Sequence, residues 1–329
     1  MIPTALCVLL ALPQTAREPD PPPELVDVVR IWDGAPHCAF TDLARFEGRW
    51  YCAFREGERH MYGADGRIRV LASDDGRAWR PAALLAEEGV DLRDPKLSVT
   101  ADGRLMVVAG GSVYDGRTLV TRRPRVAFSL DGAGFGPLQP VVEEGEWLWR
   151  VTWHLGRAWG VAYDAGREPW ALRLVVSDDG IDYRSVTELE VPGRPNETTL
   201  RFLPDGELMA LVRREGDDRQ AWIGTSRAPH TEWRWRPAGR HIGGPNFLAL
   251  PGGALWAAGR EYGEETRTAL GPIDGDGGYE PLLVLPSGGD TSYPGLVFRD
   301  GLLWVSYYSS HEGEASIYLA RVRLPGAPR

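Results

Sequence analysis

An acidic and a basic residue stand at the two ends of one short stretch, "NETTLRFLPDGELMALVR", which spans residues 196–213. Two mainly apolar runs flank a Pro-Asp-Gly turn, a pattern typical of a β-hairpin. The first residue of one strand and the last of the next lie at the same end of an antiparallel hairpin, so Glu197 and Arg213 should meet there. Such a pair forms either a salt bridge or a site that binds an anion and exchanges protons with it.

Other chemically useful residues stand at matching distances from turn glycines. Asp94 and Glu197 each lie nine residues before such a glycine, and Tyr293 lies eight residues before one. Both ends of these hairpins should return to one face, which would suit acid–base chemistry on an anionic or polyhydroxy ligand. Arg150, beside His154 at the start of another hairpin, is a further candidate for ligand contact. Seven residues after the six glycines come Arg55, Gly110, Tyr163, Arg213, Arg260 and Tyr308.

The elements that would position these residues form an internal repeat. Each unit has a turn glycine followed by an apolar and aromatic run, and the glycines are about fifty residues apart, the length of a propeller blade. Another short apolar run lies before each glycine and a third follows, while no long stretch has a helical period. The six segments are "EGRWYCAFR", "DGRLMVVAG", "LGRAWGVAY", "DGELMALVR", "GGALWAAGR" and "DGLLWVSYY".

A second repeat lies inside the first. "SDDGRAW" (73–79), "SLDGAGF" (129–135) and "SDDGIDY" (177–183) share a serine, an aspartate, a glycine and an aromatic residue at identical offsets. Serine and aspartate can accept hydrogen bonds from the amides of a tight turn, and glycine supplies the left-handed backbone. These segments lack the alternating acidic ligands and distal glutamate of a calcium loop, so they are interpreted as structural turns.

Six four-stranded units that close into a ring predict an all-β protein, a six-bladed β-propeller of antiparallel blades. We expect one domain over residues 25–329, closed by pairing "LVDVVRIW" near the N terminus with the last blade, because a ring leaves no open edge. A single charge at a strand end is usually solvated or paired across strands. The coincidence of position across the blades is what favours a shared site.

The sequence resembles the sialidase superfamily. The Ser-x-Asp-Gly-x-x-aromatic segments are similar to its Asp boxes, the bacterial neuraminidase repeats. The segment at 196–213 resembles the family segment with a catalytic glutamate and a substrate-binding arginine, which are Glu197 and Arg213 here. "TSYPGLVFRDGLLWVSYY" resembles the last-blade segment with the catalytic tyrosine, here Tyr293. The resemblance covers about residues 33–324.

The resemblance implies a retaining exo-glycosidase that acts on terminal sialic acid or a related acidic sugar. The anomeric carbon of sialic acid carries a carboxylate, which would repel a carboxylate nucleophile, and sialidases use a tyrosine instead. A glutamate draws the phenolic proton, an aspartate protonates the leaving oxygen, and three arginines bind the substrate carboxylate. No cofactor is implied.

Two parts of the family pattern are not matched by one clear residue. "CAFTDL" offers no arginine where the family carries one in the first blade, so Arg55 is the proposed substitute. The third arginine is either Arg260, by register, or Arg267, by its place after the strand. The acid/base aspartate is either Asp65, the only aspartate of the first-blade loop, or Asp94, which is better placed by register.

Two other functions remain open. One is a non-catalytic propeller that binds glycans or proteins, suggested by the missing first-blade arginine. The other is a glycosidase that acts on a neutral or uronic sugar with Asp94 and Glu197 as its carboxylate pair. A separation of about 5 Å between the two carboxyl groups would favour retention, and roughly 6.5–9.5 Å would favour inversion.

Composition narrows the partners. The formal net charge is −9, which disfavours nucleic acid. Residues 1–16 read as a signal peptide and 17–24 as a proline-rich linker, so a secreted or periplasmic protein is expected. No later segment is apolar enough to span a bilayer. The histidines are too scattered along the chain to predict a metal site. A monomer that binds a sialylated or other acidic glycan is expected.

Overall fold

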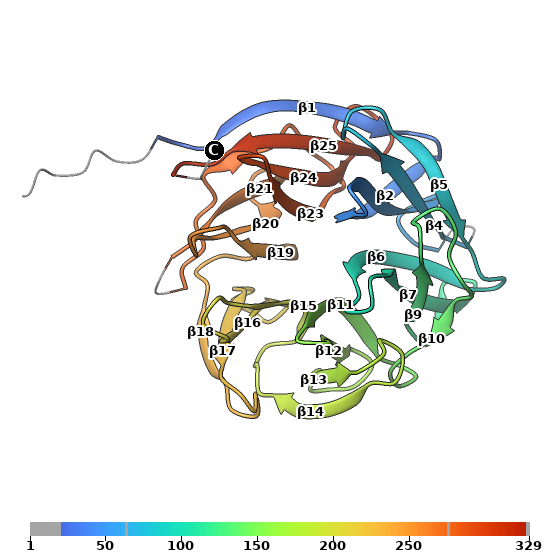
Figure 1. The fold of residues 1–329 in the computed structure, drawn as a ribbon. Helices are drawn as coiled ribbons and strands as arrows, with labels where there is room; N and C mark the ends of the chain where they lie inside the picture. Colours follow the sequence, from blue (N-terminus) through green and yellow to red (C-terminus); the bar gives the residue numbers. More distant parts are fainter. Residues whose placement is uncertain (1–20, 63–64, 275–276, 327–329) are drawn as a thin grey trace, which may run out of the picture.

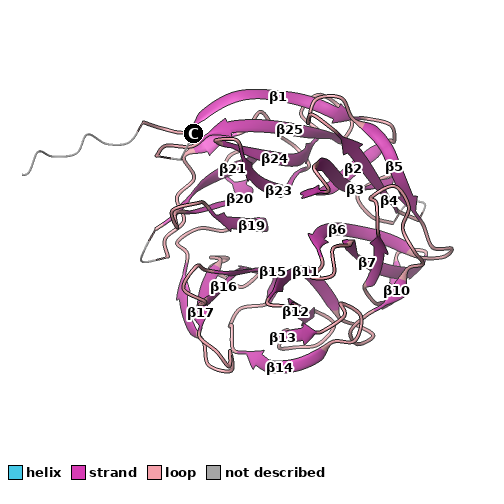
Figure 2. Ribbon diagram, in the orientation of Figure 1, coloured by secondary structure: helices cyan, strands magenta, loops and turns pink. Residues whose placement is uncertain are grey.

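Six antiparallel sheets form a ring in the computed structural model, which describes residues 21–62, 65–274 and 277–326. No helix occurs in these three ranges, and Figure 2 shows only strands and loops. The predicted six-bladed β-propeller is therefore confirmed. The expected signal peptide lies outside the described residues, as does the first half of the expected linker, residues 17–20.

Each sheet is one blade. The strands of each blade are named from the centre of the ring outward (Figure 1). Blade 1 has β2 (His37–Phe46), β3 (Arg49–Gly57), β4 (Arg67–Ser73) and β5 (Arg80–Leu85). Blade 2 has β6 (Asp91–Val99), β7 (Leu105–Asp115), β9 (Arg125–Ser129) and β10 (Gln139–Pro140), and β8 (Thr118–Arg122) pairs with the end of β7. Blade 3 has β11 (Trp147–His154), β12 (Arg157–Asp164), β13 (Ala171–Ser177) and β14 (Arg184–Leu189).

The remaining blades follow the same order. Blade 4 has β15 (Pro195–Phe202), β16 (Leu208–Arg214), β17 (Trp222–Ser226) and β18 (Arg234–Pro237). Blade 5 has β19 (Gly243–Ala249), β20 (Leu255–Tyr262), β21 (Thr266–Ile273) and β22 (Leu283–Val284). Blade 6 has β23 (Thr291–Arg299), β24 (Leu302–Ser309), β25 (Ser316–Arg323) and, as its outer strand, β1 (Glu24–Trp32).

The ring closes where the start of the chain joins its end. β1 pairs with β25 in an antiparallel ladder that places Val28 opposite Ala320, and Figure 1 shows the two strands side by side. Arg321 on β25 donates to both carboxylate oxygens of Asp27 on β1. The predicted closure by residues 25–32 is confirmed.

The repeated glycines lie where the sequence pattern placed them, at the turn between the first and second strand of each blade. All six have positive φ, between 72° and 90°. This left-handed conformation is one that glycine adopts without strain. The repeated apolar runs are thus the second strands of the six blades. The glycines are Gly48, Gly103, Gly156, Gly206, Gly253 and Gly301.

The serine–aspartate–glycine turns join the third and fourth strands of blades 1 to 3. In the third blade, Ser177 Oγ accepts a hydrogen bond from Gly180 N at 2.9 Å. Asp179 Oδ1 accepts from the next two backbone N–H groups at 2.8 and 2.9 Å. The first two blades repeat these bonds around Ser73 and Ser129. The side chains therefore satisfy the amides of the turn, as their types predicted.

An irregularity interrupts every innermost strand at one level. In each first hairpin the register shifts so that two residues oppose one, which is the signature of a β-bulge. The first residue of the pair has positive φ in four blades, among them 54° at Asp94 and 55° at Tyr293. The pairs are 40–41, 94–95, 149–150, 196–197, 244–245 and 293–294.

The bulges correct one part of the sequence-based register. Equal distance from the turn glycine had made Asp94 and Glu197 equivalent. The bulge pairs show that Asp94 shares its position with Asn196 and Tyr293, whereas Glu197 is the second residue of its pair. The β15–β16 hairpin is longer by one residue on each strand, because Pro195 pairs with Arg214 where Arg93 pairs with Gly110 in the second blade.

Two glycines test the role of the serine–aspartate–glycine turns. Gly132 has φ of 72°, and a Cβ there would overlap the buried phenol of Tyr51 in the neighbouring blade. Gly103 has φ of 80° and nothing within 4 Å of a Cβ. Gly103→Ala should cost about 1–2 kcal/mol for the left-handed backbone alone. Gly132→Ala should cost about 1–3 kcal/mol more because it also overpacks a core contact. Urea unfolding measures both, and equal losses would contradict this account.

Candidate active site

Glu197, Arg213 and Tyr293, which the sequence placed at one face, meet at the level of the bulges. Tyr293 Oη donates a hydrogen bond to Glu197 Oε1 at 2.6 Å. Arg213 Nη1 donates to Glu197 Oε2 at 2.9 Å and lies 3.4 Å from Tyr293 Oη. The backbone N–H of Gly244 donates to the same Oε2 at 2.9 Å. Three blades therefore supply one connected group, and the salt bridge at the hairpin rim is part of it.

The surroundings set the protonation of this group. Burial opposes ionisation of Glu197, but the charge of Arg213 and the hydrogen bonds from Tyr293, Arg213 and Gly244 lower its pKa below the ordinary 4.5. Burial raises the pKa of Tyr293 well above 10, and the charge of Glu197 adds to the rise. Tyr293 is therefore a neutral donor at rest, with an ionised carboxylate ready to take its proton.

Asp94 lies in the second-blade bulge, where its charge acts on Glu197 and Tyr293. Burial raises the pKa of Asp94 above 3.8, against the charges of Lys96 and Arg93. A carboxyl group with a raised pKa is suited to act as a general acid. Asp65, the alternative, is exposed on the β3–β4 loop. Of the two aspartates, Asp94 is thus the one whose charge acts on the group around Tyr293.

A second cluster lies beside Tyr293, on blades 1, 5 and 6. Arg260 Nη2 donates to Tyr308 Oη at 2.9 Å, and the guanidinium group lies 5.6 Å from the centre of the Tyr293 ring. Tyr308 Oη in turn donates to Asp290 Oδ1 at 2.8 Å. Asp290 Oδ2 lies 2.9 Å from Nε2 of His37 and 2.8 Å from Nδ1 of His60. Burial opposes ionisation of Asp290, but the hydrogen bonds with the histidines lower its pKa.

This cluster changes one expectation about metals. The histidines are scattered along the chain, yet His37, His60 and Asp290 each offer a ligand atom, and these atoms lie within 4.8 Å of one another. Two imidazoles and a carboxylate are ligands that transition metals accept. The inference that the histidines are too scattered to cluster is therefore wrong for this pair. Residues that are far apart in the sequence can lie close together in a closed ring.

Three of the proposed arginines are committed elsewhere. Arg55 is fully buried and its Nε donates to Asp91 Oδ1 at 2.9 Å, across the junction of blades 1 and 2. Arg150, the second residue of the third-blade bulge, donates through Nη1 to Asp42 Oδ2 at 2.8 Å, just past the first-blade bulge. Arg267 on β21 donates to the carbonyl of Ser287 and to Glu265. Among the described interactions, Arg213 and Arg260 are thus the predicted arginines that contact Tyr293 or lie over its ring.

Sequence analysis did not single out Lys96, although it is the only lysine in the chain. Its side chain is 1% exposed, and its Nζ lies 4.4 Å from the Trp149 ring centre and 5.6 Å from that of Tyr293. Burial and the charge of Arg150 lower the pKa of Lys96 to about 8. The sequence did offer a signal for Lys96, because it is the one lysine among many arginines and lies two residues after Asp94. Asp290, three residues before Tyr293, was also missed.

Comparison with known proteins gives structural matches only. No family model matches the sequence, and no curated protein matches it. A protein of unknown function from Dyadobacter fermentans aligns with a TM-score of 0.81 and 19% identity over 92% of this chain and 100% of that chain. A Trypanosoma rangeli sialidase in complex with sialic acid aligns with a TM-score of 0.68 and 11% identity over 93% of this chain and 59% of that chain.

An α-L-arabinanase from Penicillium chrysogenum, complexed with arabinobiose, aligns with a TM-score of 0.72 and 13% identity over 90% of this chain and 98% of that chain. The chain has a sialidase-like propeller fold. At these identities the likeness shows the fold alone. The sialidase-like propeller is thus shared by neighbours that are glycoside hydrolases of different kinds.

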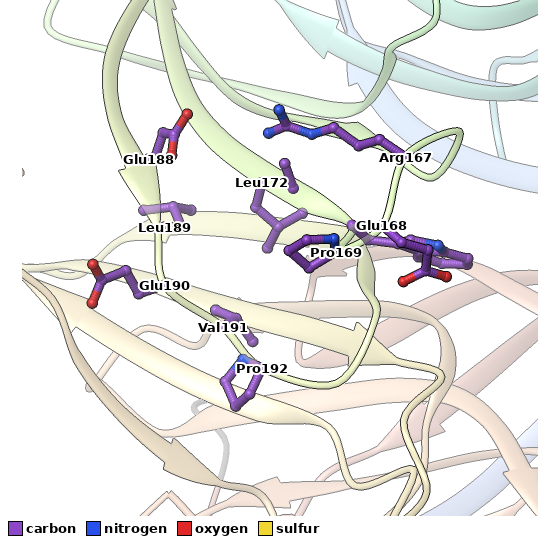
Figure 3. Close-up of a pocket in the computed structure, with 11 residues that line it drawn as sticks. Arg167, Glu168, Pro169, Leu172, Glu188, Leu189, Glu190, Val191 and Pro192 are labelled. Atoms are coloured by element: carbon purple, nitrogen blue, oxygen red, sulfur yellow. The ribbon is translucent and has the colours of Figure 1, made fainter.

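A separate hollow of about 490 Å³ lies at the outer part of blade 3 (Figure 3). Leu172 and Leu189 form part of its floor, and Glu188 and Arg167 stand at its edges. None of the residues grouped around Tyr293 lines it. The titratable groups described above therefore mark a different place, at the level of the bulges.

The buried arginine offers a test of its structural role. Replacement of Arg55 by Gln removes the closer of the two arginines that pair with buried Asp91, since Arg93 lies 3.4 Å from its other oxygen. Arg55→Gln should therefore lower the free energy of unfolding by about 3 kcal/mol, the lower end for a broken buried pair. The control is Arg49→Gln, because Arg49 pairs with Asp74 at 3.0 Å on the surface and about half of its side chain is exposed. That change should cost less than about 1 kcal/mol. Similar losses in chemical denaturation would show that Arg55 is not structural.

Proposed function

We propose that this protein is an exo-glycosidase of the sialidase type, which hydrolyses terminal sialic acid or a related acidic sugar with retention. The observation that carries the proposal is the 2.6 Å hydrogen bond from Tyr293 Oη to Glu197, with Arg213 bound to the same carboxylate. A phenol, an ionised base and a guanidinium group in contact form an activated nucleophile in the general sense. The glycosidase neighbours support the class of reaction.

The proposed reaction has two steps. Tyr293 Oη attacks the anomeric carbon and transfers its proton to Glu197, while Asp94 gives a proton to the departing glycosidic oxygen. The covalent intermediate carries the sugar on the phenolic oxygen. Asp94 then removes a proton from water, which attacks the same carbon. The phenolate leaves and regains its proton from Glu197, and both carboxyl groups return to their first state.

Charge near the nucleophile supports an acidic substrate. Arg213 and Arg260 approach Tyr293 from blades 4 and 5, and each presents guanidinium nitrogens of the kind that bind carboxylates. Their positive charge would also stabilise a phenolate as it leaves. Two nitrogens of Arg260 donate to neutral acceptors, the carbonyl of Thr291 at 2.8 Å and the phenol of Tyr308, and the carboxylate of Asp290 lies farther away, at 3.8 Å. A substrate carboxylate could therefore compete for this group.

A neutral sugar is the second candidate, and a specific observation favours it. Arg213 already pairs with Glu197 and Glu215, and Arg55 is sealed in its pair with Asp91. Arg213 and Arg55 are thus less available to a substrate carboxylate than a triad of carboxylate-binding arginines requires. In that case Asp94 and Glu197 serve as the catalytic pair, and the arabinanase-like neighbour is the better guide to substrate.

The nucleophile and the base can be removed separately. Tyr293→Phe and Glu197→Gln should each lower kcat/KM on a fluorogenic sialoside by about 10²–10⁴-fold, because each removes a proton-transfer partner. Tyr51→Phe is the matched control, since it removes a phenol that donates to the Asp131 carbonyl at a blade junction. Rates on sialoside and arabinofuranoside substrates are compared for the wild type and all three variants.

Each result has a distinct meaning. Hydrolysis of the arabinofuranoside alone would replace the acidic sugar by a neutral one. Full activity of both Tyr293→Phe and Glu197→Gln would refute the mechanism. Binding of glycans without turnover of either substrate would leave a non-catalytic lectin-like propeller.

The two carboxyl groups predict how the rate depends on pH. Glu197 must be ionised, and its lowered pKa keeps it so until the pH falls below about 4.5. Asp94 must be protonated, and its raised pKa keeps it so to a pH above 3.8. The profile of kcat/KM should be bell-shaped, with its alkaline limb set by Asp94. Asp94→Asn should abolish that limb and slow substrates with poor leaving groups far more than activated aryl glycosides. An unchanged alkaline limb would exclude Asp94 as the acid.

A further inference from the structure

The inner strands continue past the bulges and enclose a second polar site, away from Tyr293. A cavity of about 270 Å³ lies among the later residues of β2, β6, β11, β15 and β23. Arg201, which lines it, is four residues beyond Glu197, about 13 Å along an extended strand. The cavity therefore lies toward the opposite end of the ring axis. Its polar lining includes Asp42, Ser98, Arg150, Thr152 and Arg201.

Arg201 is bound only to neutral groups. Its Nη1 donates to the Leu200 carbonyl at 2.7 Å and to Thr152 Oγ1 at 3.1 Å, and its Nη2 donates to Asn246 Oδ1 at 2.8 Å. Within the described ranges, no ion pair joins Arg201 to a carboxylate. Arg201 is partly exposed, but a charge that is partly withdrawn from water without a counter-ion still carries a cost.

The neighbouring arginine has a donor to spare. Arg150 is 5% exposed, and one of its nitrogens, Nη1, contacts both oxygens of Asp42, at 2.9 and 2.8 Å. Its Nε is buried and has no hydrogen-bond partner among the described residues. Asp42 also accepts from the backbone N–H of Leu97 at 2.8 Å. Asp42 therefore pairs directly with Arg150, whereas it acts on Arg201 only through its charge and without a hydrogen bond among the described residues.

The charges around the cavity do not balance. Arg150, Arg201 and Lys96 lie close enough that the charge of Arg150 lowers the pKa of each of the other two, in addition to the effect of burial. The pKa of Arg201 is lowered to about 9, so the side chain remains cationic at neutral pH. Lys96 faces Asp94 and Glu197 on its other side. Among the described residues that line the cavity, one carboxylate, Asp42, stands against the two arginines, and it pairs directly with Arg150.

We propose that this cavity binds a small inorganic anion, of the size of chloride or phosphate, between Arg201 and the free Nε of Arg150. The anion supplies the missing negative charge and accepts the unused donor. Chloride and phosphate share the relevant chemistry, because both accept hydrogen bonds from guanidinium groups. The site is independent of the glycosidase proposal, since none of its anion-binding groups contacts Tyr293 or Glu197 within the described part of the chain.

Chloride binding can be measured directly by excess ³⁵Cl NMR line width on the purified full chain at constant ionic strength, with phosphate as competitor. The wild type should show saturable excess width that phosphate removes. Arg201→Lys retains the charge and should retain binding. Arg201→Gln should weaken it by at least about tenfold, because one of the two cations is lost. Arg184→Gln is the matched control, an exposed arginine on an outer strand.

Thermal unfolding and crystallography provide second readouts. A ligand that binds only the folded state raises Tm, so saturating phosphate should raise it by roughly 2 °C or more in the wild type and not in Arg201→Gln. Bromide-soaked wild-type crystals should show an anomalous peak between Arg150 and Arg201, even if Arg201→Gln does not fold. No saturable line width in the wild type, equal binding in Arg201→Gln, or bromide only beside Arg260 would each overturn the proposal.

Discussion

The ring of sheets is closed by pairing of the two ends of the chain, because β1 completes the sheet of β23 to β25. That ladder joins residues almost three hundred positions apart, such as Val28 and Ala320. This closure determines which residues meet at the centre of the ring. Only a closed ring brings Tyr293 of the last blade beside Phe40 of the first, at 5.0 Å between ring centres, and onto Glu197 of the fourth.

The bulges turn this shared axis into a place for chemistry. A regular strand would alternate its side chains between faces, and its backbone would remain fully paired. Where two residues of the innermost strand oppose one residue of its partner, a short segment leaves the hydrogen-bonded ladder. This happens at the same level in all six blades. Asp94, Glu197 and Tyr293 all stand in such segments. Acidic and basic groups then lie close enough to shift one another's pKa, although strands separate them along the chain.

Local patterns predicted most of the fold and the centre of the site. Gly206 and the flanking apolar runs were enough to place Glu197 near Arg213, because a hairpin depends on neighbours in sequence. The partner of Arg55 was not predictable in this way. Arg55 and Arg260 occupy the same count after a glycine, yet one turns into a blade junction toward Asp91 and the other toward Tyr308. The packing between blades decides that, and no repeat in the sequence records it.

The role of Asp290 and the exact register of Glu197 were hidden for a related reason. Asp290 lies outside the strands, and its partners His37 and His60 come from another blade. The position of Glu197 depended on one additional residue in each strand of its hairpin, which counting from a glycine could not reveal. Long-range contacts and single-residue insertions are thus the features that resist sequence analysis here.

One position at the bulges carries no side chain at all. Gly244 occupies the fifth-blade bulge with φ of 59°, and a Cβ there would come within 2.8 Å of the Tyr293 ring. The phenol therefore rests in space that its neighbour leaves vacant. A methyl group at Gly244 would act on catalysis from a residue with no reactive atom, by tilting the ring away from its proton acceptor. The absence of a side chain at Gly244 is therefore as specific a requirement as the phenol of Tyr293 itself.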